Sequence, residues 1–212
     1  MHLEFLVEEP SAEAALQNLL PKILGTGVSF NIHPHSGKTD LLAKLPGRLS
    51  GYRSWLPDDW GLVVLIDEDR EDCIRLKRDL EREALRAGLT TQSSGHRGSF
   101  EVLNRVAVEE LEAWFFGDIP ALTTAYPGIS PHLGAKRPFR DPDAIKGGTW
   151  EALERVLQRA GHHRAGLRKI EAARAISRHM TPAQNRSRSF CAFRDGLREM
   201  LQRAGYNRLS DS

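Results

Sequence analysis

The chain has 212 residues, of which 40% are hydrophobic and 27% are charged, and its formal net charge is +2. This composition is typical of a soluble globular protein. No apolar run approaches the roughly 20 residues that a membrane-spanning helix needs, and the first residues do not resemble a secretion signal, so no membrane partner is expected. The chain has two cysteines, Cys73 and Cys191, without metal-ligand spacing, which favours a reduced, cytoplasmic protein.

Alternating strand and helix signals in the first 108 residues predict an α/β fold. Strands are expected over 2–7, 28–32, 62–66 and 100–107, with helices over 11–24, 39–56 and 73–87. The uninterrupted apolar run at 62–66 suits a central parallel strand. We therefore predict a mainly parallel four-stranded sheet flanked by helices.

The second half of the chain reads as helical. A helix is expected over 109–116 and another from Asp118, which completes an α/β domain over residues 1–126. Residues 127–148 contain four of the eleven prolines and are predicted to be an irregular loop. Three helices over 149–206 form a C-terminal helical extension packed on the same domain, and 207–212 is expected to be a frayed tail.

Charge is distributed unevenly along the chain. Residues 161–212 carry 11 Lys/Arg and 4 Asp/Glu, whereas residues 1–160 carry 19 and 24. A basic tail behind an acidic domain suits a polyanionic partner, and nucleic acid is the expected one. The candidate phosphate contacts are Lys169, Arg186, Arg188 and Arg194. Alternatively, these side chains only solvate amphipathic helices.

Three acidic clusters stand where predicted strands end. Glu8-Glu9 follows the first strand, Asp67-Glu68-Asp69 the third, and 109–112 (Glu-Glu-Leu-Glu) the fourth. The carboxyl ends of parallel strands form the edge of the sheet where ligands bind. Carboxylates gathered there repel one another, so a cation is expected among them, and Mg²⁺ (or Mn²⁺) is the simplest candidate.

Five carboxylates are the candidate metal ligands. Asp67 and Asp69 are two positions apart, so both would point to one side of an extended strand end. Glu8 would bind metal or act as the base for a water nucleophile. Glu109 and Glu112 are three apart and would share a helix face. The alternatives are a turn with a helix cap before Asp72, and acidic residues that merely stabilise a first helical turn.

Lys38 is the candidate basic residue of the site. The stretch Ser36-Gly37-Lys38-Thr39 looks like the end of a phosphate-binding P-loop, but Ile32 stands where that motif requires glycine. We therefore reject a nucleotide site of that kind. Lys38 is expected instead to hold a scissile phosphate as a point charge.

A strand ending in Val7-Glu8 and another ending in Asp67-Glu68-Asp69 resemble the Toprim domain of topoisomerases, bacterial primases and overcoming-lysogenization-defect nucleases. More closely, the segments 5–9, 64–67 and 109–115 look like a bacterial Toprim-like family of unknown function. This resemblance extends over nearly the whole chain, including 185–190. It implies a Toprim-like fold, neighbouring ATPase genes and a role in phage defence. Nuclease relatives usually have glycine after the first-strand glutamate, where this chain has Glu9 and Pro10.

Two functions follow from this combination. The leading hypothesis is a Mg²⁺-dependent phosphodiesterase or nuclease in which Glu8, Asp67, Asp69 and Lys38 are catalytic. The alternative is a non-catalytic Toprim-like sensor or partner subunit of an ATPase. A homodimer is compatible with either. A phospho-receiver domain is disfavoured, because glutamates follow Val108 where that fold needs Thr or Ser and Lys.

Overall fold

The structure confirms the predicted parallel sheet. The structure is a computed structural model that describes residues 1–69, 71–95 and 98–206. The predicted tail over 207–212 therefore lies outside the described residues. Within them, four parallel strands form one sheet in the order β2-β1-β3-β4. The strands are β1 (His2–Val7), β2 (Ser29–Pro34), β3 (Trp60–Asp67) and β4 (Val102–Ala107).

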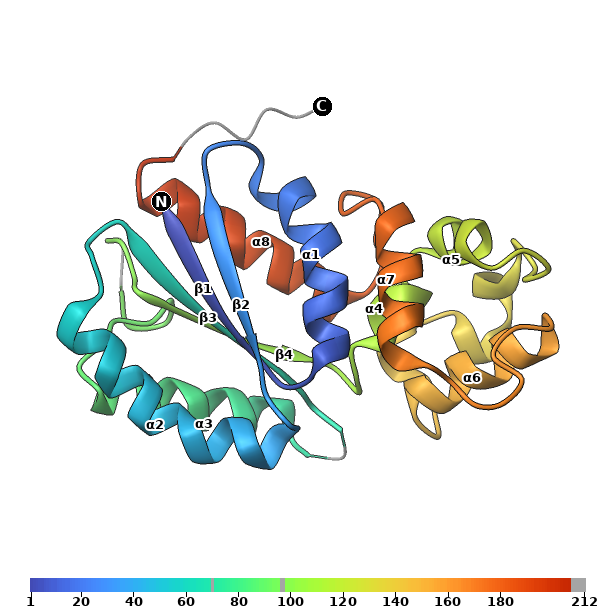
Figure 1. The fold of residues 1–212 in the computed structure, drawn as a ribbon, viewed down its shortest axis with the longest axis horizontal. Helices are drawn as coiled ribbons and strands as arrows, with labels where there is room; N and C mark the ends of the chain where they lie inside the picture. The colour runs from blue at the N-terminus through green and yellow to red at the C-terminus, as the bar shows by residue number, and fades with distance from the viewer. Residues whose placement is uncertain (70, 96–97, 207–212) are drawn as a thin grey trace.

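Helices cover both faces of the sheet, and a smaller group of helices lies at one end (Figure 1). α2 and α3 lie on one face, α1 and α8 lie on the other, and α4 to α7 gather beyond the carboxyl ends of the strands. The bounds are α1 (Pro10–Leu24), α2 (Lys38–Trp55), α3 (Cys73–Arg86), α4 (Glu112–Phe116), α5 (Ile119–Ala125), α6 (Thr149–Arg159), α7 (Lys169–His179) and α8 (Arg188–Arg203). In the described part of the chain, no helix combines the length and the apolar character needed to cross a membrane.

The alternation of side chains along the strands produces two hydrophobic cores. In β3, Val63 and Leu65 belong to the core shared with α1 and α8, whereas Val64 and Ile66 belong to the core under α2 and α3. Both faces of this strand are therefore buried, which explains its unbroken apolar sequence. α8 packs on β4 and α1, so the end of the chain completes the larger core.

α2 is continuous although Pro46, Gly47 and Gly51 interrupt its sequence pattern. Its buried side chains are Leu41, Leu45, Leu49 and Tyr52, at the spacing of one helix face. Burial of this stripe against the sheet outweighs the poor helix propensity of the proline and glycines. The predicted helix over 39–56 agrees with it to within one residue at each end.

A buried glutamate joins β1 to β2 and α2. The Glu4 carboxylate accepts hydrogen bonds from Asn31 Nδ2 at 3.0 Å and Tyr52 Oη at 3.1 Å, and it contacts His2 and His33. Burial raises the pKa of Glu4, but these hydrogen bonds outweigh it and hold the pKa below its ordinary value. His33 thus has a structural role.

Asn185 holds the segment before α8 in place, because both the nitrogen and the oxygen of its side-chain amide form hydrogen bonds. Its Nδ2 donates to the Trp114 carbonyl at 2.8 Å, and its Oδ1 accepts from the Ser187 N–H at 2.9 Å. Ser187 in turn caps α8 by accepting from the Phe190 N–H at 3.1 Å. Gly117 lies directly against this arrangement, because a β-carbon there would contact the Asn185 side chain and come within 2.9 Å of the Ser187 nitrogen.

We expect Gly117→Ala to lower the free energy of unfolding by about 1 to 3 kcal/mol, as overpacking of a filled site does. Urea denaturation measures this change. Gly47→Ala is the matched control, because a β-carbon at this helical position meets nothing within 4 Å. It is expected to stabilise the protein by roughly 0.5 to 1 kcal/mol. Equal effects of the two substitutions would contradict the close packing of Asn185 on Gly117.

Candidate active site

The carboxyl ends of β1, β3 and β4 bring together one carboxylate from each of the three acidic clusters. Glu8 directly follows β1, Asp67 is the last residue of β3, and Glu112 begins α4 shortly after β4. The register pairs Val7 with Leu65 and Asp67 with Ala107, so the three strand ends meet at one edge. The Glu8 Oε2 atom accepts a hydrogen bond from the Asp67 N–H at 3.0 Å.

Asp67 and Glu112 are buried carboxylates. Asp67 is 8% exposed and Glu112 is 1% exposed. Burial, and then the charges of Glu112 and Glu8, raise the pKa of Asp67 well above its ordinary value. Burial likewise raises the pKa of Glu112 to about 7. Glu112 Oε2 has no hydrogen-bond partner among the described residues, which is an expensive arrangement for a buried acceptor.

Glu8 has an intermediate position between this buried pair and the surface. Burial raises its pKa, the hydrogen bond from the Asp67 N–H lowers it, and the charge of Asp69 raises it again. The net result is a pKa above the ordinary value. A carboxylate with a raised pKa is suited to accept a proton near neutral pH.

Lys169 supplies a positive charge to the same site. It is the first residue of α7, its Nζ lies 3.5 Å from Glu9 Oε1, and it stands over the Trp150 ring at 5.6 Å from the centroid. Burial lowers the pKa of Lys169, but the charges of Glu112 and Glu9 outweigh burial and raise it overall. A residue predicted to contact nucleic acid from a basic tail is thus placed among the carboxylates.

Lys38 supplies a second positive charge at the end of β3. It begins α2, and its Nζ lies 2.6 Å from Asp69 Oδ2 and 3.3 Å from Glu71 Oε1. It also donates to the Glu68 carbonyl at 3.1 Å. Burial lowers the pKa of Lys38, and Asp69, by hydrogen bond and charge, raises it above the ordinary value.

The prediction that Asp67 and Asp69 point to the same side assumes that Asp69 continues the strand, but it does not. β3 ends at Asp67, and Asp69 has φ 55°, so the alternation of an extended strand does not reach it. Its side chain is 46% exposed and paired with Lys38. Its charge nevertheless raises the pKa of both Asp67 and Glu8, which places it at the border of the site.

The prediction that Glu109 and Glu112 share a helix face is wrong. α4 begins only at Glu112, and Glu109 has φ 60° in the turn before it. The Glu109 N–H donates to Glu68 Oε2 at 2.9 Å, while Glu68 Oε1 accepts from the Cys73 N–H at 3.2 Å. Burial raises the pKa of Glu109, followed by the charges of Glu68 and Glu110. Glu109 therefore belongs to this turn rather than to the buried pair.

Two glutamates that sequence reasoning set aside have definite roles. Glu110 Oε2 caps α6 by accepting from the Thr149 N–H, the Thr149 hydroxyl and the Trp150 N–H at 2.8 to 3.0 Å. Glu9 accepts from the Ser11 hydroxyl at 2.5 Å and pairs with Lys169. In the sequence, Gly147-Gly148-Thr149 indicates the start of a helix that needs a capping partner. No sequence signal identifies Glu110 as that partner.

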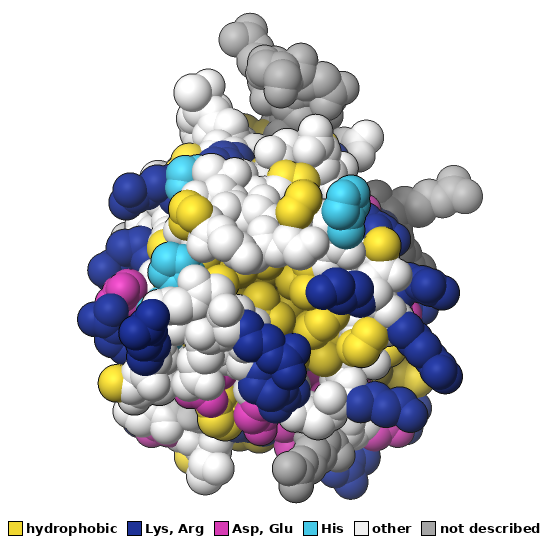
Figure 2. All heavy atoms as spheres, turned by 90° about the vertical axis from the view of Figure 1, so that its right-hand side faces the viewer, with side chains coloured by type: hydrophobic (Ala, Val, Ile, Leu, Met, Phe, Trp, Pro, Cys, Tyr) yellow, Lys and Arg dark blue, Asp and Glu magenta, His cyan; other side chains and the backbone are white. Residues whose placement is uncertain are grey.

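The three candidate nucleic-acid arginines differ in their availability. Arg186 is exposed, and Arg188 is exposed with an ion pair to Asp141 at 2.9 Å. Arg194 donates to the Pro182 carbonyl at 2.8 Å and to the Asp195 carboxylate, which gives it a structural role. On the face of the molecule beyond the strand ends, Lys and Arg side chains lie in separate groups around an apolar centre (Figure 2).

The donor set at the strand ends consists of carboxylate oxygens. Within the described ranges, no group of three or more His, Cys, Asp or Glu side chains is arranged so that it could hold a metal ion. Mg²⁺ usually takes only one or two protein carboxylates and completes its coordination with water and substrate phosphate. The unpartnered Glu112 Oε2 beside Asp67 fits this smaller requirement.

A comparison with protein families assigns the chain. The model of the domain of unknown function DUF4276 matches residues 7–198. The chain belongs to this family. The match spans β2 to β4, α1 to α7 and most of α8, and it begins at Val7, the last residue of β1, so this DUF4276 protein carries the acidic strand ends within its family domain. No curated protein and no solved structure matches the chain.

Proposed function

We propose that this protein is a Mg²⁺- or Mn²⁺-dependent phosphodiesterase that cleaves nucleic acid, that its fold is related to the Toprim domain, and that it acts in phage defence. The Toprim relationship is supported by the parallel sheet with Glu8 at the end of β1 and Asp67 at the end of β3. The phage-defence role rests on the family resemblance alone.

The buried pair Asp67 and Glu112 is the observation that carries the proposal. Two carboxylates removed from water cost free energy unless a cation or proton compensates them. Lys169 compensates part of this charge, but Glu112 Oε2 remains unpartnered among the described residues. A divalent cation would satisfy both carboxylates, and their hard oxygen atoms suit Mg²⁺.

The residues divide into three roles under this proposal. Asp67 and Glu112 would hold the cation, which when bound supplies Lewis-acid chemistry toward a phosphodiester. Glu8, with its raised pKa, would orient water and take its proton. Lys38 and Lys169 would attract and position phosphate groups. Asp69 would keep Lys38 in place through their 2.6 Å ion pair.

Cleavage of single- and double-stranded DNA and RNA by the full chain tests this proposal. With Mg²⁺ or Mn²⁺, Asp67→Asn is expected to reduce the cleavage rate by about 100-fold or more, because the cation supplies several kcal/mol of transition-state stabilisation. Asp58→Asn is the matched control, because Asp58 is exposed and precedes β3 at the opposite edge of the sheet. Equal rates for wild type and Asp67→Asn would refute the metal role.

A second candidate function is a non-catalytic sensor or partner subunit of an ATPase. It is favoured by Lys169 and Lys38, which already place cations among the carboxylates, and by Glu9 and Pro10, which replace the glycine expected after Glu8. Under this alternative, calorimetry detects no Mg²⁺ binding and the protein co-purifies with the ATPase of a neighbouring gene. Tight Mg²⁺ binding together with turnover by the isolated protein would exclude it.

A further inference from the structure

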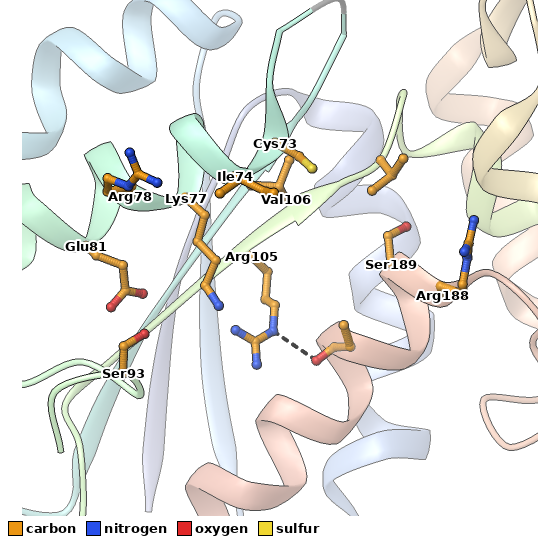
Figure 3. Close-up of a pocket in the computed structure, with 12 residues that line it drawn as sticks. Cys73, Ile74, Lys77, Arg78, Glu81, Ser93, Arg105, Val106, Arg188 and Ser189 are labelled. Carbon is orange, nitrogen blue, oxygen red and sulfur yellow. Dashed lines mark hydrogen bonds between the residues drawn. The ribbon is translucent and has the colours of Figure 1, made fainter. Parts of the chain in front are cut away.

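We propose that the cavity along the open edge of β4 binds a small amphipathic anion, which has an apolar tail and one terminal carboxylate or phosphate group. This site is separate from the proposed active site and does not depend on the proposed function. It lies between α3 and α8, where the sheet ends (Figure 3).

The cavity has the size and shape of a small-molecule site. Its volume is about 660 Å³, within the range of about 300 to 1,000 Å³ that is common for ligand pockets. β4 is an edge strand, so α3 on one face and α8 on the other form two walls beside it. The strand itself supplies Arg105 and Val106, and Val108 follows directly after it.

One end of the cavity is apolar. Ile74, Val106 and Val108 line it. Figure 3 shows Ile74, Val106 and Cys73 close together at this end. Ile74 is 67% exposed although it is a large aliphatic side chain. Covering these side chains with an apolar ligand would remove hydrocarbon surface from water.

The other end of the cavity is cationic. The side chains of Lys77 and Arg105 point toward the same part of the cavity, near Ser93 (Figure 3). Lys77 forms no hydrogen bond or ion pair with another described residue. Its ammonium group is therefore available to pair with an anionic ligand group.

Three hydrogen bonds hold the Arg105 side chain in place and leave two of its N–H groups without a partner among the described residues. It is 8% exposed, and it donates through Nε to the Ala192 carbonyl at 2.9 Å, through Nη1 to the Asn104 carbonyl at 2.8 Å and through Nη2 to Gln92 Oε1 at 2.7 Å. A guanidinium group has five N–H donors, so one N–H on each terminal nitrogen remains for a ligand. A planar pair of donors of this kind matches a carboxylate or phosphate.

The charge around the cavity is unbalanced in favour of an anion. Among the described residues, Lys77, Arg78 and Arg105 line it against one acid, Glu81, while Arg188, which also lines it, is paired with Asp141. One Glu81 oxygen accepts from Asn104 Nδ2 at 3.1 Å, the other has no hydrogen-bond partner among the described residues, and the charge of Glu81 offsets part of that of Arg105. The other acids near Arg105 already have partners: Asp195 pairs with Arg194, and Glu199 pairs with Arg203. Cations at one end and hydrocarbon at the other define an amphipathic anion as the complementary ligand.

Calorimetry with octanoate tests the proposal on the full chain. Octanoate is expected to bind, whereas octan-1-ol, which lacks the charge, and acetate, which lacks the tail, bind at least about tenfold more weakly. Octyl phosphate has the same tail, and its affinity relative to octanoate decides between the two anionic groups. Lys77→Gln is expected to weaken octanoate binding about tenfold, as loss of a charged hydrogen bond does.

Ala192→Phe provides an independent variant, because a larger side chain on the α8 wall fills part of the cavity beside Arg105 and should abolish octanoate binding. Lys146→Gln, at an exposed lysine outside the cavity, is the matched control and should bind as wild type does. Circular dichroism checks that each variant is folded. The proposal is overturned if wild type binds neither octanoate nor octyl phosphate, if octan-1-ol binds as tightly as octanoate, or if both cavity variants bind octanoate normally.

Discussion

Replacing Glu112 with glutamine is expected to raise the free energy of unfolding of the metal-free protein by about 3 kcal/mol near pH 8.5 and to leave it unchanged near pH 4. Burial raises the pKa of Glu112 to about 7, whereas the unfolded chain regains the ordinary value of 4.5. Between these values the native state binds more protons than the unfolded state. The stability that Glu112 contributes is therefore complete below its unfolded pKa and is lost as the pH rises through the folded pKa.

Urea denaturation in the presence of a chelator, measured from mildly acidic to mildly alkaline pH, checks this expectation. Wild type should lose stability across the window and Glu112→Gln should lose less. Glu13→Gln, in the first turn of α1, serves as the control and should follow wild type. Parallel pH profiles for wild type and Glu112→Gln would contradict the buried, unpartnered carboxylate.

A comparison of wild type with Glu112→Gln also separates the effect of the Glu112 carboxylate on stability from its effect on metal binding. Under the proposed function, adding Mg²⁺ near pH 8 should stabilise wild type, because a ligand that binds only the native state shifts the unfolding equilibrium. Glu112→Gln should gain little from Mg²⁺, since it lacks one of the two proposed ligands. If Mg²⁺ stabilises neither protein, the non-catalytic candidate function gains support while the pH prediction stands by itself.

Lys169→Met is expected to destabilise the protein by about 2 to 3 kcal/mol near pH 8, because it leaves buried carboxylates without their cation. This value is below the range of about 3 to 5 kcal/mol for breaking buried ion pairs, because the Lys169 side chain is 33% exposed. Methionine keeps the hydrocarbon part of the side chain over Trp150. Lys146→Met is the control at an exposed position and should cost less than about 0.5 kcal/mol.

A double-mutant cycle identifies which carboxylate Lys169 compensates. If Glu112 is its main partner, Lys169→Met should cost less than about 1 kcal/mol in the Glu112→Gln background. Thermal or urea unfolding of the four proteins gives the coupling free energy. Additive effects would mean that Lys169 acts chiefly on Glu9, whose Oε1 lies 3.5 Å from its Nζ.

Local sequence patterns were sufficient for the sheet and its acidic edge. The apolar runs of β1 and β3 stop at Glu8 and Asp67, and strand alternation with helices implied that their carboxyl ends meet. The apolar faces of α1 and α3 are likewise predictable from the spacing of their hydrophobic residues. Patterns of this kind depend on residues close together in the chain, which is why they survive without tertiary information.

The spacing of residues in the sequence does not predict the conformation of the two acidic turns that contain Asp69 and Glu109. Asp69 and Glu109 both have positive φ, and the Asp69 N–H donates to the Glu109 carbonyl at 2.7 Å across the strand ends. The spacing rules for a strand and a helix fail there because these residues belong to neither. Contacts between two different turns decide their direction, and such contacts leave no local signature.

The amino-acid pattern is sufficient for the parallel α/β architecture and for the gathering of Glu8 and Asp67, because both follow from periodicity and from where apolar runs end. The folded structure was needed to show that Glu112 lies buried in place of Glu109 and that Lys169, 57 positions after Glu112, supplies the compensating charge. Burial and electrostatic pairing depend on how α4 and α7 pack beyond the strand ends, and long-range packing is the information that residue spacing does not carry.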